Sequence, residues 1–186
     1  GGTAASLNME DFGPATQQAQ YWTCSTIDRA MVDFYISEFA LNLNNNQIYQ
    51  LYPVFPLVDA FRRTDYVPDS DYVRQEIYEV WHGPMNFFYL VSSKVYSAES
   101  AFALFHIARR RQSGDFGADD VARMGVLAPH VRRAVQMQRR FALAEAEHAS
   151  LDRLPWAIVV VDAAGRLLSC NATGEALLRA GDGLAL

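Results

Sequence analysis

The sequence predicts an α+β protein: an antiparallel sheet flanked by helices, then a long connecting helix, then a smaller unit of two strands and a helix. Three observations predict this fold class. Two runs rich in strand-forming residues, 86–95 and 101–108, are separated by only five residues, which favours an antiparallel pair. A helical pattern extends over 119–154. Strand-type sequence then returns at Trp156.

The first strand and helix are predicted from the N-terminal residues. Residues 3–12 alternate weakly between apolar and polar side chains, and Gly13-Pro14 ends this predicted strand. From Ser25 the apolar residues recur at helical spacing, and Ser25 with Asp28 resembles a helix cap. The asparagine-rich stretch 42–46 predicts a loop after this helix.

A second helix is predicted over 68–82, because its acidic first turn suits the helix dipole and Gly83-Pro84 stops it. The two runs 86–95 and 101–108 follow. Both faces of 101–108 are largely apolar, so we expect this strand to lie in the centre of the sheet. His106 on one of these faces is interpreted as a core histidine rather than a ligand or a base.

The C-terminal third predicts a helix and then a smaller α+β unit. In the helix over 119–154, Pro129 is expected either to kink the chain or to restart the helix. Residues 156–162 have the composition of a buried strand, and 166–170 form the next strand. Asn171 is expected to cap the last helix.

These elements divide the chain into three parts: a first domain over 1–118, a connecting helix over 119–154, and a partial module over 155–186. The last part is expected to be too short to fold without help. The chain begins without an initiator methionine and stops without a terminating feature, so we expect both ends to be cut.

Composition and charge narrow the function classes. The 186 residues carry a net charge of −5, but residues 1–100 have 5 basic and 12 acidic side chains, whereas the rest has 11 and 9. This acidity argues against a nucleic-acid-binding surface, which needs a dense basic footprint. No window approaches the length of a membrane span, and no signal peptide opens the chain. Cys24 and Cys170 are expected to be free thiols.

The sequence contains no catalytic or metal-binding signature. It has no phosphate-binding glycine loop, no paired-cysteine cluster and no two-histidine helix motif, and its four histidines are scattered. We therefore expect no enzyme, no metal and no cofactor.

Aromatic residues are concentrated in the first domain: 20 of the 23 lie within residues 1–105. Sites for small molecules are usually lined by aromatic rings together with a few polar groups, such as tyrosine hydroxyl and tryptophan N–H groups. Aromatic rings also fill ordinary hydrophobic cores, so this alternative stays open. The candidates for such a lining are Trp22, Tyr35, Tyr49, Tyr52, Tyr66, Tyr78, Trp81 and Phe88.

The connecting helix carries a narrow apolar stripe flanked by arginine pairs that repeat seven residues apart. Such a stripe suits pairing between helices of two subunits, and it equally suits a helix lying over the core of its own domain. The residues assigned to a dimerising or signalling role are Val131, Arg132, Val135, Arg139 and Phe141.

Parts of the chain resemble the sensor region of bacterial LuxR-type helix-turn-helix transcriptional regulators. Residues 101–143 look like the last strand and exit helix of the GAF/PAS-like sensor in that family, with Leu127, Pro129, His130, Arg132, Arg133 and Ala134 at the positions of its helix motif. Residues 151–186 are similar to the PAS-like segment that follows, with matches at Leu154-Pro155, Asp162, Gly165, Asn171 and 181–183. Residues 67–84 resemble the helix before the central strands.

The resemblance implies a cytoplasmic homodimeric regulator in which a small-molecule effector or a partner acts on the sensor, without a membrane. DNA would be bound only by a C-terminal domain that this chain does not contain. The acyl-homoserine lactone sensors of this group use an Asp-Pro to hold the lactone amide, whereas this chain has Tyr52-Pro53. The resemblance therefore implies signal sensing without naming a ligand. The alternative is a scaffold that dimerises and binds no ligand.

Overall fold

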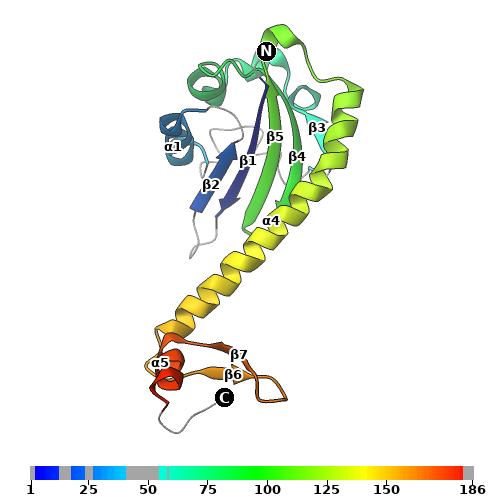
Figure 1. Cartoon of the computed structure of the whole chain (residues 1–186). Coiled ribbons are helices and arrows are strands. Elements are labelled where there is room, and N and C mark those ends of the chain that lie inside the picture. The colour runs from blue at the N-terminus through cyan, green and yellow to red at the C-terminus, as the bar shows by residue number, and fades with distance from the viewer. Residues whose placement is uncertain (1–2, 13–17, 24–26, 41–54, 58, 182–186) are drawn as a thin grey trace. The chain divides into compact units, whose positions relative to one another are not determined.

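The computed structural model describes residues 3–12, 18–23, 27–40, 55–57 and 59–181 (Figure 1). The chain forms two compact units, 1–135 and 136–186. The three-part division drawn from the sequence stays a proposal.

The first unit is built on a five-stranded antiparallel sheet. Its strands are β1 (Thr3–Asp11), β2 (Gln18–Thr23), β3 (Ala60–Arg62), β4 (Tyr89–Ser97) and β5 (Ala101–Arg109). Their order is β2-β1-β5-β4-β3. The α+β class and the central position of the strand at 101–108 are therefore confirmed.

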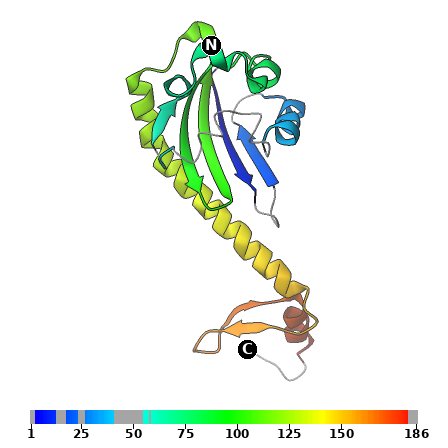
Figure 2. The ribbon, with the colours of Figure 1, turned by 180° about the vertical axis from the view of Figure 1, so that it is seen from behind.

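Helices lie on both faces of this sheet (Figures 1 and 2). They are α1 (Arg29–Glu38), the short η3 (Arg63–Asp65), α3 (Asp69–Tyr72), the π-helix η4 (Tyr78–His82), the short η5 (Arg111–Ser113) and α4 (Ala118–Asp152). Residues of α1, α3 and η4 bury their side chains against one face, and residues of α4 up to Val135 bury theirs against the other.

Register assigns residues to the two faces, because directly paired residues of antiparallel strands point to the same side. The α1 face includes Asn8 and Glu10 of β1, which pair with Leu104 and Phe102 of β5. The α4 face includes Met9, Ala103 and Phe105, which pack with Ala128 and Val135 of α4. Figures 1 and 2 also show the first turns of α4 beside β3 and β4, where Met124 packs on Val91 and Phe116.

Two strands of the sheet were not expected from the sequence. β3 has only three residues, too few for an alternation to be visible, and β2 carries polar and apolar residues on both of its faces. The first helix begins later than expected, at Arg29, because the Asp28 carboxylate caps it by accepting a hydrogen bond from the Ala30 amide, 2.9 Å away. Ser25 lies outside the described residues.

The continuous helix predicted over 68–82 is wrong. α3 ends at Tyr72, and the chain resumes as the π-helix η4, where the Gly83 amide donates to the Tyr78 carbonyl at 2.7 Å. A Cβ at position 83 would lie 2.8 Å from that carbonyl oxygen, so the turn requires glycine. Strand β4 then starts at Tyr89 rather than at 86.

The long helix forms as a single element. α4 contains Pro129 within its span, so it does not restart there. Proline lacks the N–H that would bond the carbonyl four residues earlier, at Gly125. Ala128 beside it is fully buried and packs in the cluster that joins α4 to the sheet. We infer that tertiary packing offsets the cost of the proline.

The second unit contains the last turns of α4, the hairpin β6 (Val159–Val161) and β7 (Leu167–Cys170), and α5 (Ala172–Ala180). The strand predicted over 156–162 is present as β6, but its predicted burial is wrong: Trp156, Val160 and Val161 are 71%, 44% and 42% exposed. Within the described part of this unit, two strands and one helix are too few to cover both faces of the hairpin.

Asn171 holds the second unit together and caps α5 as predicted. Its Oδ1 accepts from the amides of Ile158 and Gly174, both at 2.8 Å, and its Nδ2 donates to the carbonyls of Leu151 and Trp156. The side chain thereby uses all of its usual hydrogen-bonding capacity on backbone groups of the unit.

Candidate functional site

The most unusual feature of the first unit is a group of polar side chains buried on the α1 face. Asn8 and Glu10 are 1% and 0% exposed. The Glu10 Oε1 accepts hydrogen bonds from the Asn8 amide nitrogen, 2.8 Å away, and from the Tyr35 hydroxyl of α1, 3.1 Å away. Burying a carboxylate is costly, so a core that served only stability would favour an apolar residue here.

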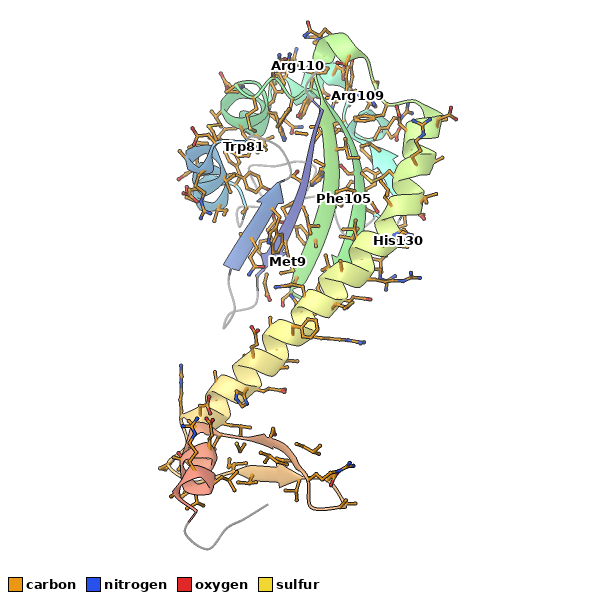
Figure 3. All side chains as sticks on the ribbon, viewed as in Figure 1. Met9, Trp81, Phe105, Arg109, Arg110 and His130 are labelled. Carbon is orange, nitrogen blue, oxygen red and sulfur yellow. The ribbon has the colours of Figure 1, made fainter. Side chains whose placement is uncertain are left out.

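Aromatic rings surround this polar group. The rings of Tyr35 and Trp81 lie 5.2 Å apart, centroid to centroid, and join α1 to η4. Phe102 pairs with Glu10 across the strands, and its ring lies 5.6 Å from that of Phe12. In Figure 3 the labelled Trp81 lies near α1, whereas the labelled Phe105 lies toward α4. The buried carboxylate therefore belongs to a ring-rich layer.

Further polar residues lie on the α1 face in β4. Lys94 pairs with Leu104 and is 6% exposed, and its burial lowers the pKa of the ammonium group. Ser92 pairs with His106, and the Ser92 hydroxyl oxygen lies 2.7 Å from the His106 Nδ1. Burial lowers the pKa of His106 to about 4, so this imidazole is neutral at pH 7. The hydrogen bond agrees with the interpretation of His106 as a core histidine with a satisfied partner.

A second polar cluster lies under α3 and η4. The Arg63 guanidinium is buried and stacks over the Tyr72 ring at 4.1 Å, while its nitrogens donate to the Val67 and Phe88 carbonyls and to the Asp69 carboxylate. Through these contacts the Arg63 side chain links η3 to α3 and to the start of β4.

The histidine of η4 joins the same cluster. The Tyr72 hydroxyl oxygen lies 2.8 Å from the His82 Nδ1. Burial is the main cause that lowers the pKa of His82 to about 3, and electrostatic interactions with His106 and Arg63 lower it further. Burial likewise raises the pKa of the Tyr72 hydroxyl. Both groups are therefore uncharged at neutral pH, where they hold each other through a neutral hydrogen bond.

The six aromatic candidates that the structure describes do not form one site. Tyr35 and Trp81 lie together in the cluster around Leu104, and Tyr78 and Phe88 lie together in the cluster with Tyr72, with ring centroids 5.8 Å apart. Tyr66 is 42% exposed at the edge of the Phe55 and Phe61 rings.

The remaining candidates are Trp22, Tyr49 and Tyr52. Trp22 pairs with Leu7 on the α4 face and is 40% exposed, so it does not share the layer of Tyr35 and Trp81. Tyr49 and Tyr52 lie outside the described residues.

Sequence reasoning missed Asn8, Glu10 and Lys94. A signal for the first two was present: they are two residues apart within a predicted strand, so they share one face. Their register against Phe102 and Leu104 was the missing information.

The residues assigned to the dimerising helix are divided by the structure. Val135 is buried and Val131 is half-buried against the sheet of their own chain, as in the alternative of a helix that lies over the core of its own domain. Their dimerising or signalling role stays a prediction. Phe141 is 64% exposed. Arg132 and Arg139 are half-buried.

Within the described residues, no group of three or more His, Cys, Asp or Glu side chains is arranged to hold a metal ion. None of the helices described combines the length and the apolar character that crossing a lipid bilayer demands. Cys170 is a half-buried free thiol.

No protein-family model and no curated protein sequence matches the chain. Two solved structures are similar. The VqsR ligand-binding domain from Pseudomonas aeruginosa matches with a TM-score of 0.51 and 16% identity, over 75% of this chain and 77% of that one. CepR2 from Burkholderia cenocepacia, an N-acylhomoserine lactone dependent LuxR family transcription factor, matches with a TM-score of 0.44 and 12% identity, over 75% and 76%. The first likeness establishes the fold of the chain.

Proposed function

We propose that this chain is the signal-sensing region of a LuxR-type transcriptional regulator, and that a small molecule binds on the α1 face of its sheet. One observation carries the proposal: a carboxylate, an amide and a tyrosine hydroxyl are buried together among aromatic rings. The fold likeness to the VqsR ligand-binding domain supports the same assignment. Sites for small molecules combine an apolar lining with a few convergent polar groups.

The site is assigned to Asn8, Glu10, Tyr35 and Trp81, with Leu104 and Phe102 beneath them. These residues come from β1, β5, α1 and η4, so a bound molecule would contact every layer on this side of the sheet. The hydroxyl and amide would fix its orientation, and the rings would bury its apolar body.

We assign signal transmission to an equilibrium between two arrangements of the sensor. The effector binds one arrangement more tightly and so shifts the equilibrium toward it. β5 connects the two faces, because Leu104 points to the α1 face and Ala103 and Phe105 point to α4. We assign a GAF/PAS-like architecture to the sensor and a PAS-like character to the second unit. The output would be a helix-turn-helix DNA-binding domain of the full regulator.

Homodimerisation is assigned to the part of α4 beyond Val135. This segment exposes Met137, Phe141 and Leu143 by 56%, 64% and 62%, more than a helix without a partner usually leaves in water. We expect light scattering to report a dimer for the chain and a monomer for Phe141→Glu, with Glu147→Gln as the matched surface control. A dimer that persists in Phe141→Glu would contradict this assignment.

A thermal-shift screen of chemically diverse small molecules tests the sensing role. A molecule that binds only the folded state raises the melting temperature by mass action. We expect at least one class of compound to raise it, and we expect Tyr35→Phe to reduce that rise. A library without a single stabilising compound would contradict the proposal.

The second candidate function is a dimerising scaffold with a solid interior. It is favoured by the complete burial of several large side chains on the α1 side, which are Phe39, Tyr72, Trp81 and Phe88. A chain that dimerises and yet responds to no compound in the same screen would support the scaffold.

A further inference from the structure

We infer that the molecule bound on the α1 face carries an sp² oxygen, as in a ketone, ester, amide or carboxylate, and that the imidazoles of His82 and His106 donate hydrogen bonds to it. This inference rests on the proposed function and names the chemical class of the ligand for that site. The class follows from the position of the two rings, from the hydroxyl group that each ring contacts and from the N–H group that remains on each ring.

His106 lies on the α1 face of β5. It is two residues from Leu104, so the two side chains point to the same side of the sheet. On this face His106 pairs with Ser6 of β1 and with Ser92 of β4. The imidazole therefore lies in the middle of the sheet, in line with the apolar residues of the candidate site.

His82 of η4 covers the same end of this face. The Tyr72 hydroxyl contacts its Nδ1, and the Tyr72 side chain packs in one cluster with Leu90 and Ala108. Ala108 is the residue after His106 on the α1 face of β5. Burial is the main cause that lowers the pKa of His82, and an electrostatic interaction with His106 lowers it further. The two rings are therefore neighbours between η4 and the sheet.

The contact that each ring makes determines which of its nitrogens carries the proton. Ser92 and Tyr72 are 4% and 0% exposed, and in the described part of the chain each hydroxyl has one hydrogen-bond partner, the Nδ1 of its histidine. A buried hydroxyl hydrogen without an acceptor is costly, so each hydroxyl donates to Nδ1. Both imidazoles are neutral at pH 7 and therefore carry their hydrogen on Nε2.

The Nε2–H group of each ring is available to a ligand. Among the residues that the structure describes, none accepts a hydrogen bond from the Nε2 of His82 or His106, and both rings are only half-buried. An sp² oxygen has two lone pairs and accepts from two such donors. An ammonium group has only hydrogens to offer, so it finds no acceptor at these nitrogens. The pair therefore favours an oxygen acceptor over an amine.

The residues that precede His106 on the α1 face indicate the rest of the molecule. Leu104 and Phe102 follow at steps of two residues, roughly 7 Å each, and both belong to the apolar cluster of Trp81. Phe102 in turn pairs with Glu10 of β1. The bound molecule thus has an apolar body along β5 and its oxygen at the histidine end.

Matched probes test the class in the unaltered protein. Benzylacetone, hydrocinnamate and the amine with the carbon skeleton of benzylacetone share a phenylalkyl body and differ at the polar end. We expect the ketone, the carboxylate or both to raise the melting temperature of the full chain and to bind in calorimetry about tenfold more tightly than the amine. The tighter of the two shows whether the preferred oxygen is neutral or anionic. An amine that binds as tightly as both would overturn the inference.

Variants of the two histidines locate the donors. Asparagine keeps an acceptor at the position of Nδ1 and has no donor at the position of Nε2, whereas glutamine places an amide N–H there. We expect His82→Asn and His106→Asn each to weaken the binding of the oxygen-bearing ligand about fivefold, and the two Gln variants to retain more of the affinity. His130→Asn, at an exposed position of α4, is the control and should leave the affinity unchanged.

Circular dichroism checks that the variants fold, and the probe comparison in the unaltered chain does not depend on them. Folded Asn variants with unchanged affinity, or Gln variants that lose as much as the Asn variants, would overturn the assignment of the donors.

The outcomes separate the inference from the function on which it rests. If the broad screen finds ligands that lack an sp² oxygen, and the Asn variants do not weaken them, sensing stands and the inference fails. If no compound of any class stabilises the chain, both fail.

Discussion

The two faces of the same five-stranded sheet are built from different chemistry. The α4 face joins Met9, Ala103 and Val95 to Ala128 and Val135 of the helix. Its buried polar side chains are Ser93 of β4 and Asp11 at the end of β1. The α1 face buries a carboxylate, an amide and an ammonium group among its rings, and the half-buried His106 imidazole contacts Ser92 on the same face. Polar burial costs stability, and the larger set of buried polar groups on the α1 face is the observation on which the proposed binding site rests.

The largest expected effect is the loss of stability on replacing a buried tryptophan of the α1 face, compared with the loss on replacing an exposed tryptophan. Trp81 is 2% exposed and contacts Tyr35, whereas Trp156 is 71% exposed. Replacing a buried large ring by alanine removes its transfer free energy and leaves a cavity, so Trp81→Ala should lower the free energy of unfolding by about 3–5 kcal/mol. Chemical denaturation followed by circular dichroism measures it.

Trp156→Ala is the matched control and should stay within about 0.5 kcal/mol of the unaltered chain. A small loss at Trp81 would mean that the α1 layer is loosely packed. That result would contradict the proposal that α1 and η4 pack closely around the candidate site.

The α4 face is tested by two methionines of the same helix. Met124 is 1% exposed and packs on Val91 and Phe116, whereas Met137 is 56% exposed. Met124→Ala should cost about 2–5 kcal/mol of unfolding free energy, because its neighbours close only part of the cavity. Met137→Ala should cost less than about 0.5 kcal/mol in the monomer. Similar losses in both variants would contradict the assignment of Met124 to the sheet-facing side of α4.

The smallest expected effect is the change that removing one histidine makes, between pH 6 and 5, in the pH dependence of the α1 side. The folded-state pKa values of His82 and His106, about 3 and about 4, lie below the ordinary value of 6.5. As the pH falls below 6.5, the unfolded chain binds protons that the folded chain does not. Stability is therefore full above pH 6.5 and declines toward pH 4, by at most about 1.4 kcal/mol per pH unit for each histidine.

The variant His106→Asn should flatten this decline between pH 6 and 5, while His130→Asn, at an exposed position of α4, should leave it unchanged. Urea denaturation at a series of pH values provides the measurement. An unaltered slope in His106→Asn would mean that the imidazole is charged in the folded protein.

Patterns among neighbouring residues correctly predicted several strands and the last helix. The alternation in 3–12, the paired runs before and after the loop at 98–100, and the Asn171 cap needed only neighbouring residues, and the structure has β1, β4, β5 and α5 there. The helix over 68–82 failed because a π-turn at Tyr78 depends on the packing of Trp81 and on the glycine that follows.

The candidate site was predicted only in part, because its members meet through strand pairing. Tyr35 and Trp81 were named for their ring chemistry, and they do meet. Glu10 was not named, since its environment depends on the register of β1 against β5, 91 to 99 residues later in the chain. Trp22 was named, yet its strand pairs it with Leu7 on the opposite face.

Mass spectrometry of small molecules carried through purification tests the central claim most directly. The chain is purified from a bacterial host, denatured, and its released small molecules are compared with those from the Trp81→Phe and Glu10→Gln variants. The account predicts a molecule near one equivalent in the unaltered protein and its loss or depletion in the variants. Equal amounts in all three proteins would contradict the α1 face as the binding site, and no molecule together with no thermal-shift ligand would contradict sensing itself.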